Sequence, residues 1–328
     1  MAKSDSKKLT KKKLSEPHPA PVNSLESPRF AGLSTFMRLP HIADAKRLDV
    51  ALIGVPFDGG TSYRTGTRFG PRHIREQSAI IRPYNPVLDI SPFELLRVAD
   101  YGDLPVNPLS INDSFKRITR GLGPVLEAGT IPICVGGDHS ILLPILRAMH
   151  AKHGPVALIQ FDAHSDTWDQ YWGMKYSHGT PVRRAIEEGL LAEPYILQIG
   201  LRGQLYDSHD LDFAREHKIS MITAEEFHEH GLALVRQKLK PFKNRKVYFS
   251  LDIDVVDPAF APGTGTPQVG GLSSVQILDL VRSLAGLNFV GCDLVEVSPE
   301  YDSSEITSLL AANLLFEQLC LVSTCFSR

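Results

Sequence analysis

Three short clusters of acidic and histidine residues in the 328-residue chain carry the donor atoms that divalent cations bind. They read Gly-Gly-Asp-His at 136–139, Asp-Ala-His-Ser-Asp at 162–166 and Asp-Ile-Asp at 252–254. In an extended segment, side chains at positions i, i+2 and i+4 face the same side. The donors of the second cluster therefore converge, and so do those of the third.

Together these clusters predict a centre of two divalent metal ions. A single Asp-x-Asp is more often a turn or a helix cap, so it is the coincidence of three clusters that favours metal. Converging carboxylates without a cation would repel one another and lose their hydration. Oxygen donors with two imidazoles favour Mn²⁺, Fe²⁺, Co²⁺ or Ni²⁺ over Zn²⁺. The predicted ligands are His139, Asp162, His164, Asp166, Asp252 and Asp254.

Two further residues could complete a catalytic mechanism. His178 follows the second cluster, and a histidine titrates near neutral pH and can move protons, although a loop histidine is most often solvent-exposed. Glu296 lies inside an apolar run, where a carboxylate needs a cationic or hydrogen-bonding partner. If that partner is the substrate, a planar guanidinium fits it through paired N–H bonds. The alternative is a salt bridge to a nearby arginine.

The elements that position these residues alternate between apolar runs and amphipathic stretches. We expect strands at 50–55, 96–100, 131–135, 156–161, 195–199, 219–222, 247–253 and 289–297. Helices are expected at 71–79, 110–128, 142–150, 180–188, 208–216, 232–240, 274–285 and 307–319. Strands that are apolar on both faces require a parallel sheet covered on both sides. The predicted fold is therefore an α/β three-layer αβα sandwich with a mainly parallel sheet.

The three clusters also lie where predicted strands end: after Val135, after Phe161 and after Phe249-Ser250-Leu251. In open parallel sheets, ligands bind beyond the carboxyl ends of the strands. The predicted chemistry and the predicted position of these residues therefore agree.

Composition excludes several classes of function. A net charge of −2 gives no electrostatic basis for binding nucleic acid or an anionic membrane. The four cysteines form no Cys-x-x-Cys pair, so we expect no disulfide framework and a reducing, cytoplasmic location. The apolar runs are all shorter than the roughly 18 residues of a membrane span.

The first 27 residues differ from the rest because they are rich in lysine and proline. They lack the apolar region of a secretory signal. We interpret residues 1–27 as a flexible basic tail and 28–328 as one catalytic domain. A docking arm on another subunit is the alternative reading of the tail.

Beyond these local patterns, the chain resembles the ureohydrolase family, which includes arginases, agmatinases, guanidinobutyrases and guanidinopropionases. The resemblance covers nearly everything from Arg29 to the last helix. The motifs that carry it are Gly-Gly-Asp-His-Ser (136–140), Phe-Asp-Ala-His-Ser-Asp (161–166), Ser-His-Gly-Thr-Pro (177–181), Ser-Leu-Asp-Ile-Asp-Val-Val-Asp-Pro (250–258), Ala-Pro-Gly-Thr-Gly-Thr-Pro (261–267) and Asp-Leu-Val-Glu-Val-Ser-Pro (293–299).

The resemblance implies an arginase-like fold, two metal ions that are usually manganese, with nickel as the main alternative, and a trimer or hexamer. One ion would be held by His139, Asp162, Asp166 and Asp252. The other would be held by Asp162, His164, Asp252 and Asp254. Asp166 would orient the attacking hydroxide, Glu296 would bind the guanidinium and His178 would pass a proton to the leaving amine. The products would be urea and an amine or ammonia.

The loop after the second cluster bears on the substrate. It lacks the small polar stretch that arginases share, and it contains Trp168, Tyr171, Trp172 and Tyr176. If Trp168, Trp172 and Tyr176 line the pocket, a small guanidine fits best: guanidine, an N-alkylguanidine, guanidinopropionate or guanidinobutyrate. These aromatics could instead pack the loop against the body or a neighbouring subunit. An agmatinase is the alternative activity.

Two other classes remain open at this point. A deacetylase or a formiminoglutamate hydrolase could share the scaffold, but a deacetylase would bind one Zn²⁺ with paired histidines, and the chain has no His-His pair. A non-enzymatic partner of a true ureohydrolase is the second class. There we would expect ligand loss, and all six predicted ligands are present.

Overall fold

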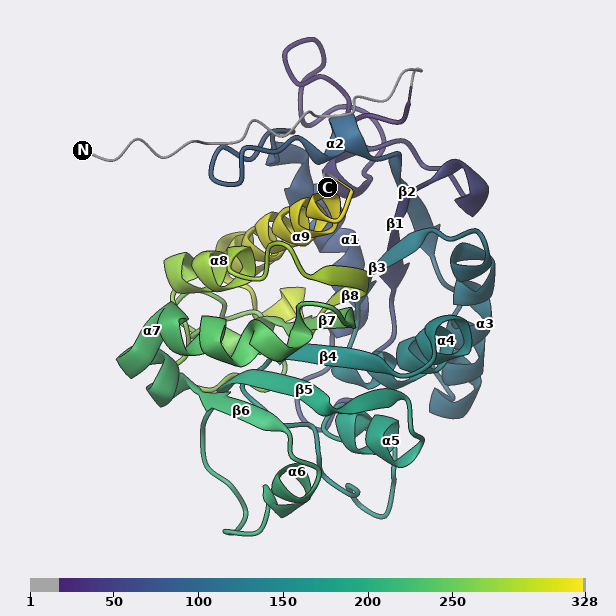
Figure 1. The fold of residues 1–328 in the computed structure, drawn as a ribbon. Coiled ribbons are helices and arrows are strands. Elements are labelled where there is room, and N and C mark those ends of the chain that lie inside the picture. Colours follow the sequence, from purple (N-terminus) through teal and green to yellow (C-terminus); the bar gives the residue numbers. More distant parts are fainter. Residues whose placement is uncertain (1–17, 327–328) are drawn as a thin grey trace, which may run out of the picture.

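Eight parallel strands form one sheet in a computed structural model that describes residues 18–326 (Figure 1). Their order across the sheet is β2-β1-β3-β8-β7-β4-β5-β6. The strands are β1 (Val50–Val55), β2 (Val98–Asp103), β3 (Ile131–Gly136), β4 (Val156–Phe161), β5 (Leu191–Leu201), β6 (Ser220–Thr223), β7 (Lys246–Asp252) and β8 (Asn288–Val295). All seven pairings between them are parallel, which confirms the predicted sheet.

Helices cover both faces of this sheet. They are α1 (Gly70–Gln77), α2 (Pro92–Leu95), α3 (Ile111–Glu127), α4 (Leu142–His153), α5 (Pro181–Glu187), α6 (Asp212–Glu216), α7 (Ala224–Leu239), α8 (Ser274–Arg282) and α9 (Ile306–Thr324). In Figure 1, α1, α7, α8 and α9 lie on one side of the strands and α3, α4 and α5 on the other. Two separate clusters of buried apolar side chains, one on each face, confirm the three-layer arrangement.

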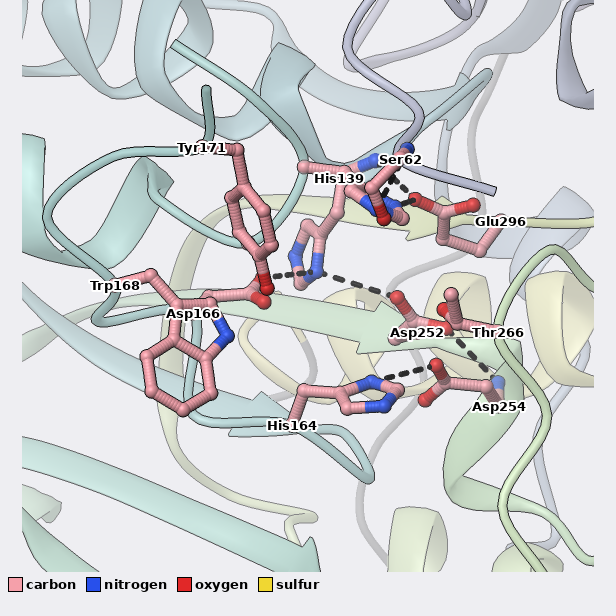
Figure 2. A pocket seen from close by; sticks show the side chains of 12 residues that line it. Ser62, His139, His164, Asp166, Trp168, Tyr171, Asp252, Asp254, Thr266 and Glu296 are labelled. Atoms are coloured by element: carbon pink, nitrogen blue, oxygen red, sulfur yellow. Dashed lines mark hydrogen bonds and ion pairs between the residues drawn. The ribbon is translucent and has the colours of Figure 1, made fainter. Parts of the chain in front are cut away.

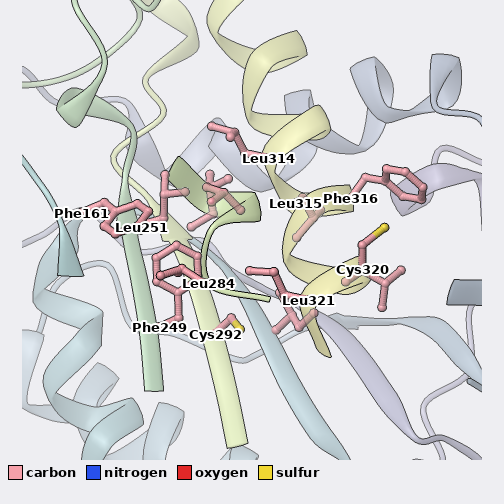
Figure 3. Close-up of a cluster of buried hydrophobic side chains, with 14 of the residues drawn as sticks. Phe161, Phe249, Leu251, Leu284, Cys292, Leu314, Leu315, Phe316, Cys320 and Leu321 are labelled. Carbon is pink, nitrogen blue, oxygen red and sulfur yellow. The ribbon is translucent and has the colours of Figure 1, made fainter. Parts of the chain in front are cut away.

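Helix α9 is long and apolar enough to cross a membrane, but it forms part of the core. Of its apolar window, 78% is buried inside the fold. Figure 3 shows Leu315 and Leu321 from this helix in the same apolar cluster as Phe249 and Cys292 from the sheet. A helix that is apolar all round is expected where neighbours surround it. Its composition is therefore explained by packing.

The predicted strands are confirmed to within four residues at each end, whereas several helices differ more. Helix α9 continues to Thr324, beyond the predicted end at 319. Helix α7 begins at Ala224 rather than at 232 because Thr223 and Glu226 form a capping box. Gly231, with φ of 57°, then kinks it. Helix α6 is shorter than predicted, and the short α2 was not predicted. Pro92 and a four-residue length leave α2 without a periodic signal.

Part of the predicted tail lies against the body of the protein. Residues 1–17 of the predicted tail lie outside the part of the chain that the structure describes. The amide of Val22 donates to the carbonyl of Arg38 at 3.1 Å. The Arg38 guanidinium in turn donates to the carbonyl of Ser27 at 3.1 Å and to Ser24 Oγ at 3.2 Å. Nε2 of His18 also lies within hydrogen-bond distance of the carbonyl of Phe93, so the chain contacts the body from the first described residue. The domain boundary at residue 28 stays a prediction.

Candidate metal centre

Four neighbouring strands in the middle of the sheet deliver the candidate residues. In the order β3-β8-β7-β4, His139 lies just beyond β3, Glu296 directly follows β8, Asp252 ends β7 and Asp162 directly follows β4. The strands are parallel, so their carboxyl ends meet at one edge of the sheet. Figure 2 shows His139, Asp252 and Glu296 pointing into one pocket. The predicted position of the site follows from this strand order.

His139 contacts three carboxylates. Its Nδ1 lies 2.8 Å from Oδ2 of Asp166, 3.0 Å from Oδ2 of Asp162 and 3.3 Å from Oδ2 of Asp252. Its Nε2 lies 2.8 Å from Oγ of Ser250, on the side away from the carboxylates. The serine therefore orients the ring so that Nδ1 faces the acidic groups.

His164 occupies the other half of the site. Its Nδ1 lies 3.0 Å from Oδ2 of Asp254 and 3.5 Å from Oδ1 of Asp162. Asp162 thus presents one oxygen to each histidine. The possible ligand atoms fall into two groups that share this residue: His139, Asp162 and Asp166; and Asp162, His164 and Asp254. Asp252 adjoins the first group through His139.

Burial and mutual repulsion dominate the electrostatics of this acidic cluster. Burial, together with the charges of Asp254 and Asp162, raises the pKa of Asp252 well above its usual range. Burial and Asp162 raise the pKa of Asp166 to about 6. Burial would also raise the pKa of Asp162, but hydrogen bonds with His139 and His164 hold it below its usual range. The carboxylates therefore need more positive charge than the protein supplies.

Unpaired buried atoms indicate where that charge would sit. Nδ1 of His139, Oδ2 of Asp166 and Oδ2 of Asp254 are buried and lack a hydrogen bond, although each lies within ion-pair distance of a neighbour. Buried polar atoms in native proteins almost always have a partner. Lone pairs that face each other across a pocket fit metal ions. The residues present therefore fit a pair of divalent ions.

The two carboxylate oxygens of Glu296 have different hydrogen-bonding surroundings. Oε1 accepts hydrogen bonds from the amide of His139 at 2.8 Å and from Nδ1 of His178 at 2.9 Å. Oε2 is buried and has no hydrogen-bond partner in the part of the chain that the structure describes. Within residues 18–326, Glu296 pairs with His178 and with no arginine, so the salt-bridge alternative is wrong. One oxygen remains for a cationic ligand.

His178 is buried rather than exposed as a loop histidine commonly is. Burial lowers its pKa, but the charge and hydrogen bond of Glu296 outweigh that effect and raise the pKa to about 9. On the other side of the ring, Nε2 lies 2.6 Å from Oγ of Ser62. The backbone amide of Ser62 also donates to Nε2 at 3.1 Å, which requires an unprotonated nitrogen and opposes the shift. His178 is thus linked to Glu296 and to the pocket wall.

Two of the site carboxylates have unusual backbone conformations. Asp166 has φ of 54° and Glu296 has φ of 64°. Residues other than glycine rarely adopt the left-handed region, and the surrounding structure must compensate for the strain. Such strain is concentrated at functional sites. It is an independent indication that the position of these carboxylates matters more than local stability.

The aromatic residues of the loop after the second cluster separate into three environments. Trp168 and Tyr171 line the inner pocket of about 60 Å³ that also contains His178. Their rings lie so close to Gly179 that a Cβ there would come within 2.8 Å of Trp168 and 3.0 Å of Tyr171. Trp172 is 81% exposed and lines only an outer cavity.

Tyr176 requires a correction, because it lines neither of these cavities. Its ring packs 5.3 Å from that of Phe115, and its hydroxyl accepts a hydrogen bond from Arg147 at 3.5 Å. It anchors the loop against α3 and α4, which is the packing role that the sequence left open. We therefore remove Tyr176 from the predicted substrate-binding residues.

Sequence reasoning missed three residues that shape the site. Ser62 and Thr266 line the inner pocket. Arg202 donates hydrogen bonds to the carbonyls of Asp254 at 2.6 Å, Val255 at 3.1 Å and Gln268 at 2.8 Å. It therefore joins the loop that carries the candidate ligand Asp254 to a loop of the pocket wall. For Ser62 the signal was the Gly- and Pro-rich loop after β1, and for Thr266 it was the motif at 261–267, because such loops are where backbone approaches a ligand closely.

Comparison with known proteins gives a consistent result. The Arginase family model matches residues 48–320. The chain is 50% identical to a guanidinopropionase of Pseudomonas aeruginosa over 317 residues, covering 96% of this chain and 99% of the relative. A guanidinobutyrase of the same organism is 47% identical over 306 residues, covering 92% and 96%.

A solved structure agrees with these relatives. Proclavaminate amidino hydrolase from Streptomyces clavuligerus superimposes with a TM-score of 0.84 at 44% identity, covering 91% of this chain and 99% of that one. Residues 48–320, which the family model matches, include all eight strands of the sheet. The chain belongs to the arginase family.

Proposed function

We propose that this protein is a ureohydrolase that cleaves a C–N bond of a small guanidino compound to give urea and an amine or ammonia. The observation that carries the proposal is the unpaired Oε2 of Glu296, which lies in the same small pocket as the carboxylate and histidine cluster. A buried carboxylate oxygen without a partner binds a planar N–H donor. The relatives named guanidinopropionase and guanidinobutyrase support this reading.

The ligand sets that fit metal are those predicted from the resemblance. His139, Asp162, Asp166 and Asp252 would hold one divalent ion, and Asp162, His164, Asp252 and Asp254 the other. When bound, such a pair lowers the pKa of water and stabilises negative charge that develops on the substrate. The arginase family uses two divalent ions, and we propose Mn²⁺, with Ni²⁺ as the alternative.

The protein's own residues perform the remaining tasks. Oε2 of Glu296 binds the guanidinium and sets its plane. Asp166 orients the attacking water through a carboxylate oxygen. His178 holds a proton at Nδ1, where it donates to Oε1 of Glu296, and delivers it to the leaving nitrogen. Trp168 and Tyr171 exclude bulk water from the inner pocket.

A urea-release assay tests the proposal. Purified protein loaded with Mn²⁺ or Ni²⁺ is incubated with guanidine, methylguanidine, 3-guanidinopropionate, 4-guanidinobutyrate, agmatine and arginine. We expect urea from at least one small guanidine and little from arginine. Failure on every compound with both metals bound would remove the proposal, and one tightly held zinc per chain would favour a deacetylase-type enzyme. Cytoplasmic location and a homotrimer or homohexamer remain predictions, the latter checked by light scattering.

A further inference from the structure

The inner pocket opens into a larger outer cavity. The outer cavity measures about 790 Å³, against about 60 Å³ for the inner pocket. The two share Ser62, His164, Trp168, Tyr171 and Thr266 as lining residues. A smaller cavity of about 280 Å³ beside Arg202 shares only His164 and Trp168 with the inner pocket. The outer cavity is therefore the wider route for the remaining atoms of a substrate whose guanidinium contacts Glu296. The groups lining that cavity decide which substituent the enzyme accepts.

The side chains that line the outer cavity carry positive charge and no negative charge. Its lining includes Arg64 and no aspartate or glutamate. The remaining residues are neutral or aromatic apart from His164, which belongs to the metal site. A distal ammonium group, such as that of agmatine, would find no carboxylate there. A distal carboxylate would meet a wall that includes Arg64.

Arg64 is held in place while its N–H groups stay available. Its guanidinium carbon lies 4.7 Å from the ring centroid of Tyr301 and 5.6 Å from that of Tyr63. Stacking on ring faces leaves the edges of the guanidinium, with their N–H donors, free to bind. Within residues 18–326, Arg64 forms no ion pair. The side chain is half-buried, so a carboxylate bound to it would be partly shielded from solvent.

The position of Arg64 along the chain suits a short substrate. Ser62 contacts His178 in the inner pocket, and Arg64 is only two residues further on. Two residues of chain span at most about 7 Å. A separation of two or three methylene groups between guanidinium and carboxylate is of the same order.

We propose that Arg64 binds the carboxylate of a guanidino-acid substrate and so selects such acids over neutral or cationic guanidines. The inference rests on the function proposed above and names its substrate class. Arg64 is a specificity residue that contacts the distal end of the substrate. Its fork of N–H donors matches a carboxylate with two parallel hydrogen bonds.

The test compares substrates that differ only at the distal end. The kcat and KM of the metal-loaded enzyme are measured for 3-guanidinopropionate and 4-guanidinobutyrate, and for N-propylguanidine and N-butylguanidine as neutral counterparts. In R64Q we expect kcat/KM for the acids to fall by about 10- to 100-fold, mainly through KM. Turnover of the alkylguanidines stays within about twofold, which also shows that the variant is folded. R64K recovers part of the loss because lysine offers a single point charge.

A surface arginine provides the matched control. Arg72 on α1 is 80% exposed and pairs with Glu76, so R72Q removes the same charge outside the cavity. It should leave the preference for acids unchanged. An R64Q enzyme with an unaltered ratio of acid to alkylguanidine turnover would overturn the role of Arg64 and leave the ureohydrolase proposal intact. A wild-type enzyme that prefers alkylguanidines or agmatine would also overturn the proposed role of Arg64. Absence of urea from every guanidino compound would instead refute the proposed function.

Discussion

Nδ1 of His178 lies 2.9 Å from Oε1 of Glu296, and both side chains are buried. This contact joins the residue proposed to move a proton to the residue proposed to bind the guanidinium. Because Oε1 is occupied, the substrate must use Oε2. Protonation of the histidine and binding of the cation therefore affect the same carboxylate.

Replacing Glu296 with Gln separates substrate binding from metal binding. Gln keeps the size and a hydrogen-bond acceptor for the His139 amide, but loses the charge that binds a guanidinium. We expect urea release to fall by about 10²- to 10³-fold while metal content per chain is unchanged. Glu300→Gln, at an exposed position four residues further on, is the control and should keep full activity. Retained activity in E296Q would exclude Glu296 from the reaction.

Replacing Asp252 with Asn should remove metal and activity together. Asp252 is buried beside His139. Residues that only hydrogen-bond to metal ligands contribute roughly 10- to 100-fold to metal affinity, so the loss of a ligand such as Asp252 should lower metal affinity by more than that. Elemental analysis and the melting temperature with added Mn²⁺ measure the change. Asp257→Asn is the control, since Asp257 accepts from the backbone amides of Gly270 and Gly271 outside the site. Two ions retained in D252N would contradict a ligand role.

The two tryptophans should behave differently. Trp168→Ala removes a wall of the inner pocket and should weaken turnover of the smallest guanidines while admitting longer ones. Trp172→Ala removes a ring that is 81% exposed, so its effect on small guanidines should stay within about threefold. Substrate profiles of the two variants check this. A larger effect for Trp172 than for Trp168 would show that the loop closes over the substrate.

Arg202 should act through position rather than through contact with substrate. Arg202→Met removes hydrogen bonds to three or more backbone carbonyls and should lower the free energy of unfolding by roughly 2–4 kcal/mol. Metal affinity should fall with it, because Asp254 belongs to the loop that loses support. Arg215→Met, on the exposed surface of α6, is the matched control. Stability and metal affinity equal to those of the wild type would show that the two loops keep their positions without Arg202.

The contact between His178 and Glu296 predicts a pH-dependent stability. Glu296 raises the pKa of His178 from 6.5 to about 9 against the opposing effect of burial. The charged pair therefore stabilises the fold fully below about pH 6.5, and this contribution is lost as the pH rises through about 9. The difference in unfolding free energy between the metal-free wild type and His178→Asn should be roughly 2–4 kcal/mol at pH 6 and shrink by pH 10. A difference independent of pH would mean that the Ser62 amide keeps His178 neutral.

Local patterns in the sequence were sufficient for the cluster of candidate metal ligands and for the fold class. The i, i+2 and i+4 spacing of Asp162, His164 and Asp166 expresses the period of extended backbone. Apolar runs alternating with amphipathic stretches predict a covered parallel sheet. These signals depend only on neighbours in the chain, which is why strand ranges such as 50–55 and 156–161 agree with the structure.

Only the tertiary structure decided which residues meet. Nothing local places β8 between β3 and β7, yet that order brings Glu296 within hydrogen-bond distance of His139 and His178. The same holds for the aromatic loop, where Trp168 faces the pocket and Tyr176 packs on Phe115. Strand order and loop packing depend on contacts between residues far apart in the sequence, and a pattern read along the chain does not contain them.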